Sequence, residues 1–242
     1  MAKQARAVQT RRSIVEAAAS VFAECGYERA ATSEILRRAN VTKGAMYFHF
    51  PSKESLAQAI MDGQTSLVTV PPQLSPLQSV IDITHQFAHV LRHDALARAG
   101  TRLSIEGVFF HGTHPWDDWF DLTTRLLAEG QEQGEVLPQV VPRETAEFVV
   151  ATFTGVQLVS EAVSRRADLR VRVGVMWRHI LPSIAHPATI ARLRPEGATD
   201  PAEQVARRNA DAETTGQDTD TGTTGQDADS TDRGAGVTAG TG

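Results

Sequence analysis

The chain has 242 residues, of which 41% are hydrophobic and 22% are charged, a composition typical of a globular protein. Its net charge is −5, and it has one cysteine and no run of about 18 apolar residues, so we expect neither an internal disulfide bond nor a membrane-spanning segment. The single cysteine and the polar, basic N-terminus, which has no apolar signal sequence behind it, favour a cytoplasmic protein.

The first part of the chain is predicted to form four short helices. The spacing of apolar residues places them at about residues 10–25, 33–39, 42–50 and from 52 onward. Gly26 is a natural stop for the first helix, and Thr42 can cap the third with its side chain. The residue before Pro51 avoids helical geometry and so ends the third helix, while Ser52 can cap the next one. The short turn between the second and third helices is typical of a helix-turn-helix unit.

A proline-rich connection at residues 69–76 leads into a second, longer helical region. No strand-like alternation is sustained there, and apolar residues recur at three- and four-residue spacing. Pro142 suits the first turn of one long helix, and Asp168 can cap the last one. Helices are therefore expected at about residues 77–93, 95–108, 116–130, 142–166 and 169–185. The fold class predicted for the ordered chain is all-α.

Charge is distributed unevenly along the chain. Residues 1–60 carry nine basic and five acidic side chains, a net charge of +4, whereas residues 198–242 carry nine acidic and three basic ones, a net charge of −6. The C-terminal stretch is rich in Thr, Gly and Asp and has almost no apolar residues to bury, so it is predicted to be disordered. We therefore expect three parts, called here the head (1–60), the body (61–196) and an acidic tail (197–242).

The segment 41–54 of the head combines side chains suited to contacting DNA. Lys43 and Lys53 can neutralise phosphates, and each neutralised phosphate releases counterions. Gly44 lets the backbone come close to DNA, while hydroxyl, phenol and imidazole groups can hold phosphates and fix the register. The candidate DNA-binding residues are Arg38, Thr42, Lys43, Gly44, Tyr47, His49 and Lys53.

A plainer explanation of these residues is the solvated face of an ordinary three-helix unit. It accounts for any one of them, but not for a hydroxyl, a glycine and two lysines together at this spacing. We therefore favour a DNA-binding helix-turn-helix, in which Lys43 and Tyr47 are the best candidates for reading base edges.

A specific pattern runs through about fifty residues of the head. It consists of Phe22, Gly26-Tyr27, Ile35, Ala39, Val41, Thr42-Lys43-Gly44, Tyr47, His49-Phe50 and Lys53. This pattern resembles the DNA-binding domain of the TetR family of one-component repressors, with Met46 as a conservative departure from the usual leucine. The resemblance implies a third helix that enters the major groove of double-stranded DNA, a homodimer and a near-palindromic operator.

Further stretches carry a narrower likeness, at residues 1–10, 58–62, 98–107, 114–116, 119 and 153–161. They resemble one branch of that family, the gamma-butyrolactone autoregulator receptors. This resemblance implies that the body binds a small diffusible lactone and dimerises, that ligand binding releases the DNA, and that the regulated genes serve antibiotic production or differentiation. Because residues 67–72 and 109–113 match the branch only loosely, a receptor-like protein responding to an antibiotic or another hormone stays open as an alternative.

The same resemblance places a ligand-sensing tryptophan at Trp119, whose indole offers an apolar wall and one N–H donor. Thr154 can supply a hydroxyl group, and Gln64, near the junction with the head, can report occupancy to the fourth helix. Val156 and Leu158 complete the candidate ligand-binding residues. For the tryptophan, the threonine and the glutamine, a position in an ordinary hydrophobic core is the plainer alternative.

The remaining constellations do not favour an enzyme. His85, His89 and His93 recur every four residues, a spacing that can chelate a metal, but no glutamate follows the first histidine as in metalloproteases. The sequence also has no glycine-rich phosphate loop and no nucleophile elbow. We therefore expect no catalytic residue, metal or cofactor. A helical small-molecule enzyme or carrier and an architectural DNA-binding protein are the competing hypotheses.

The expected assembly is a homodimer without a membrane partner. The last two long helices, at about 142–166 and 169–185, are predicted to pair with those of a second copy in a four-helix bundle across a two-fold axis. Two heads would then meet successive major-groove faces about one DNA turn apart, roughly 34 Å.

Overall fold

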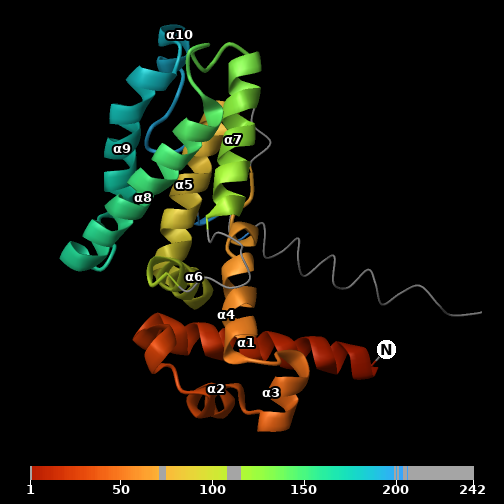
Figure 1. Cartoon of the computed structure of the whole chain (residues 1–242). Helices are drawn as coiled ribbons and strands as arrows, with labels where there is room; N and C mark the ends of the chain where they lie inside the picture. Colours follow the sequence, from red (N-terminus) through yellow and green to blue (C-terminus); the bar gives the residue numbers. More distant parts are fainter. Residues whose placement is uncertain are drawn as a thin grey trace, which may run out of the picture.

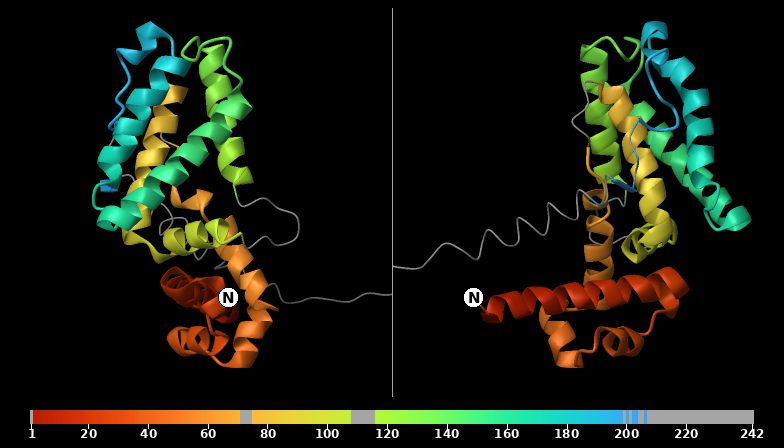
Figure 2. Two further views of the ribbon diagram at one scale, coloured as in Figure 1. Left: turned by 60° about the vertical axis from the view of Figure 1, so that its left-hand side comes forward. Right: turned by 180° about the vertical axis from the view of Figure 1, so that it is seen from behind.

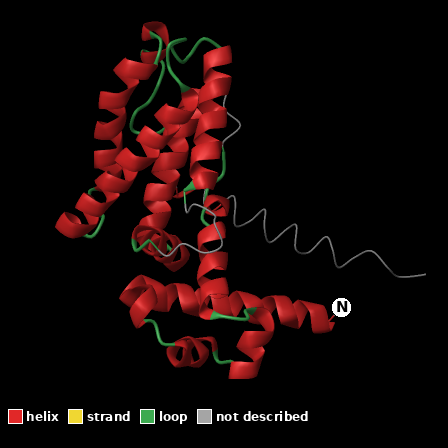
Figure 3. Ribbon diagram, in the orientation of Figure 1, coloured by secondary structure: helices red, strands yellow, loops and turns green. Residues whose placement is uncertain are grey.

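The computed structural model describes residues 2–70, 75–107, 116–198, 200, 202–203 and 206. In these ranges the regular structure is helical, as Figure 3 shows, and the one β-type feature is an isolated bridge between Val136 and Ala185. The all-α prediction is therefore confirmed. Residues 71–74 of the proline-rich connection, residues 108–115 and nearly all of the predicted acidic tail lie outside the described residues.

Four helices make up the head: α1 (Ala2–Arg29), α2 (Thr32–Ala39), α3 (Lys43–His49) and α4 (Lys53–Asp62). Helix α1 lies across the lower part of the molecule, α2 and α3 lie beneath it, and α4 rises from the head toward the body (Figure 1). Two views from other sides show the same arrangement (Figure 2). The predicted division at residue 60 falls within α4, so this helix belongs to both parts.

Local sequence explains where these helices start and stop. Helix α1 begins well before the predicted start, and Gly26 interrupts it with a φ of 77°, which glycine adopts without steric cost. The predicted caps are confirmed: the Thr42 hydroxyl accepts a hydrogen bond from the Ala45 N–H at 3.2 Å, and Ser52 and Ser55 form a capping box at the start of α4.

The hydrophobic core of the head is completed by a helix of the body. Ile14, Phe22 and Ile35 are fully buried in it, as predicted for the inner faces of the first two helices. Ala99 and Leu103 belong to the same cluster and lie on α6 (Ala95–Ile105), which packs against α1. A displacement of α6 would therefore be transmitted directly to the head.

The rest of the body consists of η1 (Thr65–Leu67), α5 (Pro76–His93), α7 (Asp117–Glu132), α8 (Pro142–Ser164), α9 (Leu169–Ile184) and α10 (Pro187–Ile190). The short elements η1 and α10 were not predicted. Asp168 precedes α9 as predicted, but its carboxylate accepts hydrogen bonds from Ser160, Ser164 and Arg172 instead of capping the helix. These bonds hold the α8–α9 turn together.

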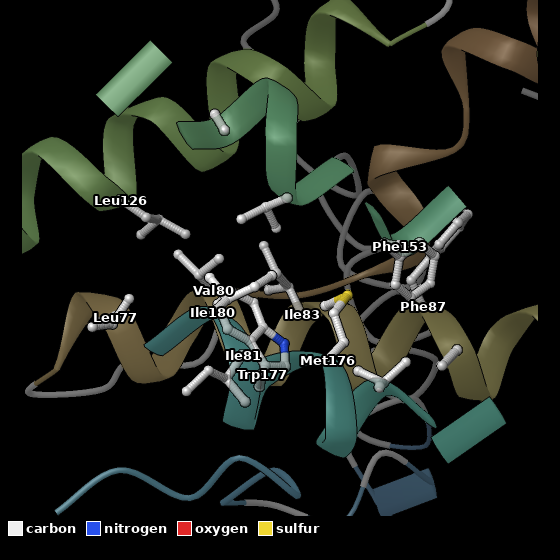
Figure 4. Close-up of a cluster of buried hydrophobic side chains, with 14 of the residues drawn as sticks. Leu77, Val80, Ile81, Ile83, Phe87, Leu126, Phe153, Met176, Trp177 and Ile180 are labelled. Atoms are coloured by element: carbon white, nitrogen blue, oxygen red, sulfur yellow. The ribbon is translucent and has the colours of Figure 1, made fainter. Parts of the chain in front are cut away.

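Helix α5 lies among α7, α8 and α9, so its side chains form the centre of the body core (Figure 2). Trp177 of α9 is fully buried beside Ile81 and Ile180 (Figure 4). Its indole N–H donates to the Thr84 hydroxyl at 2.8 Å, so the one polar atom of this large side chain is satisfied.

The chain stays packed slightly beyond the predicted start of the tail. The side-chain amide of Gln78 exchanges two hydrogen bonds with the backbone of Arg194, at 2.8 and 3.2 Å. Further on, the N–H of Ala198 donates to Asp82 at 2.8 Å. These hydrogen bonds hold residues 194–198 against α5.

Candidate DNA-binding surface and ligand cavity

The outer face of α3 carries most of the candidate DNA-binding residues. Thr42, Lys43, Gly44 and Tyr47 are exposed, and His49 is half-buried. A Cβ atom placed on Gly44 would meet no atom within 4 Å, so the packing of the head does not itself require glycine there. A position left this open suits a surface on which another backbone lies closely.

The two candidate lysines stand at the first positions of α3 and α4. The Nζ atom of Lys43 lies 5.8 Å from the centroid of the Tyr47 ring, and the Nζ atom of Lys53 lies 4.3 Å from that of Tyr27. These cation–π contacts orient the ammonium groups without neutralising their charge. Both cations remain able to bind an anion.

Arg38 differs from the other candidates. Its guanidinium group donates to Glu24 at 2.6 and 2.7 Å, to Glu34 at 2.7 Å and to Ser20 at 2.8 Å. Hydrogen bonds from Arg37 and Arg38 lower the pKa of Glu34 to about 2, so this carboxylate stays ionised at neutral pH. The structure thus gives Arg38 a role in holding α2 against α1 rather than a free guanidinium group facing DNA.

The structure adds two residues that the sequence analysis passed over. The side chain of Phe48 is 82% exposed, although large apolar groups are normally covered, whereas Phe50 just after α3 is buried. Arg6 lies near the unpredicted start of α1 and lines the same groove as Thr42 and Phe48. The signal for Arg6 was present in the basic N-terminus, but without the longer α1 nothing placed it beside α3.

An apolar cavity that is partly open to solvent lies in the body between α5, α6, α7 and α8. The aromatic rings of Phe87 and Trp119 meet there with their centroids 4.7 Å apart, and Phe153 lies 6.0 Å from Phe87. A largely apolar cavity with a few polar groups is typical of small-molecule sites. It is lined by Gln64, Ile83, Thr84, Phe87, Thr101, Ser104, Trp116, Trp119, Thr123, Val149, Val150, Phe153, Thr154 and Gln157.

Three of the five predicted ligand-binding residues line this cavity: Trp119, Thr154 and Gln64. The structure does not bring Val156 and Leu158 to it. Val156 follows Thr154 by two positions, which places it across the helix, in a groove toward α9. The side chain of Leu158 is exposed and does not line the cavity.

Gln157 is one of the lining residues that the sequence analysis missed. It follows Phe153 by four positions and Thr154 by three, so it shares their face of α8. This helical spacing could have found it once the threonine was chosen. Its side chain is 1% exposed, and its Oε1 atom accepts hydrogen bonds from Arg166.

Gln64 links the cavity to the head. It lies between α4 and η1, is 4% exposed, and donates to the Ser104 hydroxyl of α6 across a long 3.4 Å contact. A Cβ atom on Gly100 of α6 would come within 2.6 Å of Gln64, so glycine is needed for the two to pack. The amide therefore touches both the cavity and the helix that completes the head core.

The outer face of α8 is apolar and exposed in the single chain. A groove toward α9 is lined by Val156 and Val159, and Phe148 and Val175 line it as well. By length and composition α8 could cross a membrane, since its mean hydropathy reaches 1.3, yet only 28% of that window is buried in the chain. Its other face packs against α7 and α9, so the apolar excess lies on the outward side.

The three histidines of α5 do not form a metal site. His85 is buried, and its Nε2 atom lies 2.8 Å from the Pro195 carbonyl, which fixes the tautomer with the proton on Nε2. His89 and His93 face each other with ring centroids 4.6 Å apart. Within the described ranges no group of three or more His, Cys, Asp or Glu side chains could hold a metal ion.

Comparison with known proteins agrees with this geometry. Residues 14–60 match the family of "bacterial regulatory proteins, tetR family", and residues 74–185 match the "tetracyclin repressor-like, C-terminal domain". The A-factor receptor protein of Streptomyces griseus is 67% identical over 213 residues, which cover 88% of this chain and 77% of that protein.

Solved structures share the fold, and two of them are compared with the chain as follows. One, described as the molecular basis for control of antibiotic production by bacterial hormones, has a TM-score of 0.67 and 33% identity, covering 74% of this chain and 99% of the other. A gamma-butyrolactone receptor (ArpA-like protein) has a TM-score of 0.61 and 29% identity. The match covers 85% of this chain and 99% of the receptor chain. The chain therefore belongs to the TetR family of bacterial regulatory proteins and is a transcription regulator, not an enzyme.

Proposed function

We propose that the protein is a homodimeric repressor that binds a near-palindromic operator and releases it when a gamma-butyrolactone-type signal occupies the body cavity. The observation that carries this proposal is the position of the cavity. Its wall includes Gln64, which packs against α6, and α6 in turn completes the core of the head. A ligand in the cavity therefore lies two contacts away from the DNA-binding unit.

The head supplies the DNA contacts. Thr42, Lys43, Gly44, Tyr47, His49 and Lys53 remain the proposed contacts, and exposure adds Arg6 and Phe48. The lysines and the arginine would bind phosphates and set the salt dependence. The exposed ring of Phe48 suits an apolar contact with a thymine methyl group in the major groove.

The outer face of α8 supplies the dimer contact. A soluble chain seldom leaves a contiguous apolar groove of this kind uncovered, and the same face repeated on a second copy would cover both. Pairing α8 and α9 across a two-fold axis makes a four-helix bundle and places two heads on one side of the dimer. Two heads require two half-sites, which explains a near-palindromic target.

The relatives suggest the class of ligand and the regulated process. One similar protein is named for A-factor, one similar structure for gamma-butyrolactone, and another for antibiotic production controlled by bacterial hormones. The cavity suits such a compound because aromatic rings can cover a lactone's hydrocarbon part and its polar groups can meet the oxygens. We extend these properties to this chain, which would act on DNA in the cytoplasm and control antibiotic production or differentiation.

Release follows from linkage between the two sites. A ligand shifts the equilibrium between two body shapes only by its difference in affinity for them. A ligand that fills the cavity against Trp119 would favour a body shape in which Gln64 is displaced. The helices α4 and α6, which contact Gln64, would be displaced with it. Because both helices carry the head, the separation of the two heads changes and no longer matches the two half-sites.

A titration of operator DNA tests this function. The purified protein is mixed with DNA from upstream of its own gene, and a discrete complex is expected in a gel-shift assay. Adding an acyl-substituted gamma-butyrolactone should dissolve the complex. A smooth, sequence-independent shift, or a complex that the lactone leaves intact, would count against the proposal.

A further inference from the structure

The amide group of Gln157 has an unused donor. Its Nε2 atom is buried and has no hydrogen-bond partner among the described residues, while the residue lines the body cavity. A buried donor without a partner costs stability, and native structures rarely keep one without a reason.

The orientation of this amide is fixed by its neighbour. Arg166 donates to the Oε1 atom of Gln157 from Nε at 3.3 Å and from Nη2 at 2.9 Å. A guanidinium group has no acceptor, so the atom facing it must be the oxygen and the NH₂ group must point away. Arg166 is itself held by Glu161, 2.9 Å from its Nη1 atom, and its backbone N–H donates to Ser160.

Three hydroxyl groups of the cavity cannot supply the same donor. The hydroxyl hydrogens of Thr154, Thr84 and Ser104 are donated to the backbone carbonyls of Val150, Ile81 and Gly100 at 2.7–2.9 Å. To a ligand these hydroxyl groups can offer only lone pairs. A ligand carbonyl oxygen, which can only accept, therefore cannot be bound by these hydroxyl groups, whereas the NH₂ group of Gln157 can donate to it.

We propose that Gln157 is a ligand-binding residue whose NH₂ group donates a hydrogen bond to the carbonyl oxygen of the lactone, and that Arg166 is the positioning residue that keeps this donor turned toward the cavity. The inference rests on the proposed function for the class of ligand. It adds an orientation: the carbonyl end of the ligand lies against α8, with the hydrocarbon part against the rings of Phe87 and Trp119.

The test compares two probes that differ only in the carbonyl group, gamma-decalactone and 2-hexyltetrahydrofuran. Their dissociation constants are measured by calorimetry for the wild type and for Gln157→Glu, which keeps the oxygen that Arg166 requires and replaces the donor by an acceptor. The preference for the lactone, expressed as the ratio of the two constants, should fall by about tenfold in the variant, the cost of leaving a buried acceptor unpaired.

Two further variants serve as controls for this measurement. Glu161→Gln changes the other partner of Arg166, about half exposed and outside the cavity lining, and it should leave the ratio unchanged. Gln157→Met has no titratable group and fills a similar volume, so it should lower the ratio even if Gln157→Glu fails to fold.

The outcomes separate this inference from the proposed function. An equal ratio in the wild type and both Gln157 variants overturns the role of Gln157, whether or not the lactone releases DNA. A ratio that depends on Gln157 while the operator stays bound supports the role of Gln157 and contradicts the proposed release. If neither probe binds the wild-type cavity, both fail.

Discussion

The outer face of α3 and the body cavity differ in what the fold requires of their residues. On α3, a side chain added at Gly44 would face open space, and the Tyr47 side chain is 41% exposed. The fold of the head therefore does not require glycine or tyrosine at these two positions. In the cavity, Gln64 and Phe153 are buried and contribute to packing. A substitution on α3 should therefore alter binding alone, whereas one in the cavity should alter binding and stability together. The outer face of α8 resembles α3 in this respect.

The largest effect is expected from a charge on the outer face of α8. Val159 is 51% exposed and lines the groove toward α9, so Val159→Glu should leave the chain folded but place a charge in the proposed dimer interface. Two linked heads gain about 10²-fold or more in affinity over one. Sedimentation should show monomers, and operator affinity should fall by about that factor.

Val141→Glu is the matched control. Val141 is similarly exposed, at the start of α8, but it does not line the groove. The control should stay dimeric and bind the operator normally. A Val159→Glu protein that remains a dimer would remove this face from the interface.

Trp119→Ala should affect both response and stability. Loss of the indole removes a wall of the cavity and the ring contact with Phe87, so the lactone concentration needed to release DNA should rise by about 100-fold or more. The free energy of unfolding should fall by about 2 kcal/mol, because the removed side chain leaves a void in a partly buried site. Urea denaturation measures the second effect, and Trp119→Phe should preserve much of both. An unchanged response to the lactone would show that the ligand binds elsewhere.

Lys43→Ala should lower operator affinity by about tenfold and reduce the slope of log K against log salt by about 1.8, the contribution of two phosphate contacts, one from each subunit of the proposed dimer. Its melting temperature should match that of the wild type, since the ammonium group of the lysine only lies over the exposed ring of Tyr47. Arg125→Ala, which removes an exposed cation from α7, is the control and should change neither quantity. Equal salt slopes for the Lys43→Ala protein and the wild type would contradict the assignment.

The smallest effect concerns pH. Burial lowers the pKa of His85, an effect that Arg170 reinforces and the Pro195 hydrogen bond opposes. The unfolded chain therefore binds a proton more readily than the folded one, so this contribution to stability is complete above the unfolded pKa of about 6.5 and is lost as pH falls. Between about pH 8 and about pH 5.5 the urea midpoint should fall more for the wild type than for His85→Gln. Equal falls would show that the folded and unfolded chains bind this proton with the same pKa.

The head was largely predictable from the sequence because its signals are local. Thr42 and Ser52 cap their helices as their side-chain chemistry predicts, and Gly26 breaks α1 where expected. Arg38 was not predictable in the same way, since the carboxylate of Glu24 that holds it lies fourteen positions away on α1. The spacing of residues along a helix shows that a side chain points outward. It does not show whether that side chain already forms an ion pair with another helix.

The cavity was only partly predictable because it is built from helices far apart in sequence. Trp119 and Thr154 line it as expected, yet choosing Val156 overlooked that two positions along a helix turn a side chain to the other face. Gln157 depends on Arg166, which reaches back from beyond the end of α8. Nothing in the local pattern of either residue indicates that pairing.

Distances between the two heads test the coupling between cavity and head most directly. Spin labels are placed at Glu28→Cys, an exposed site of the head, in a Cys25→Ala background that removes the single native cysteine. In the dimer, one distance distribution should be seen, and an acyl-substituted gamma-butyrolactone should shift it in the wild type but not in Trp119→Ala. A missing inter-subunit distance, or a distribution that stays unchanged while the lactone releases the operator, would contradict this coupling.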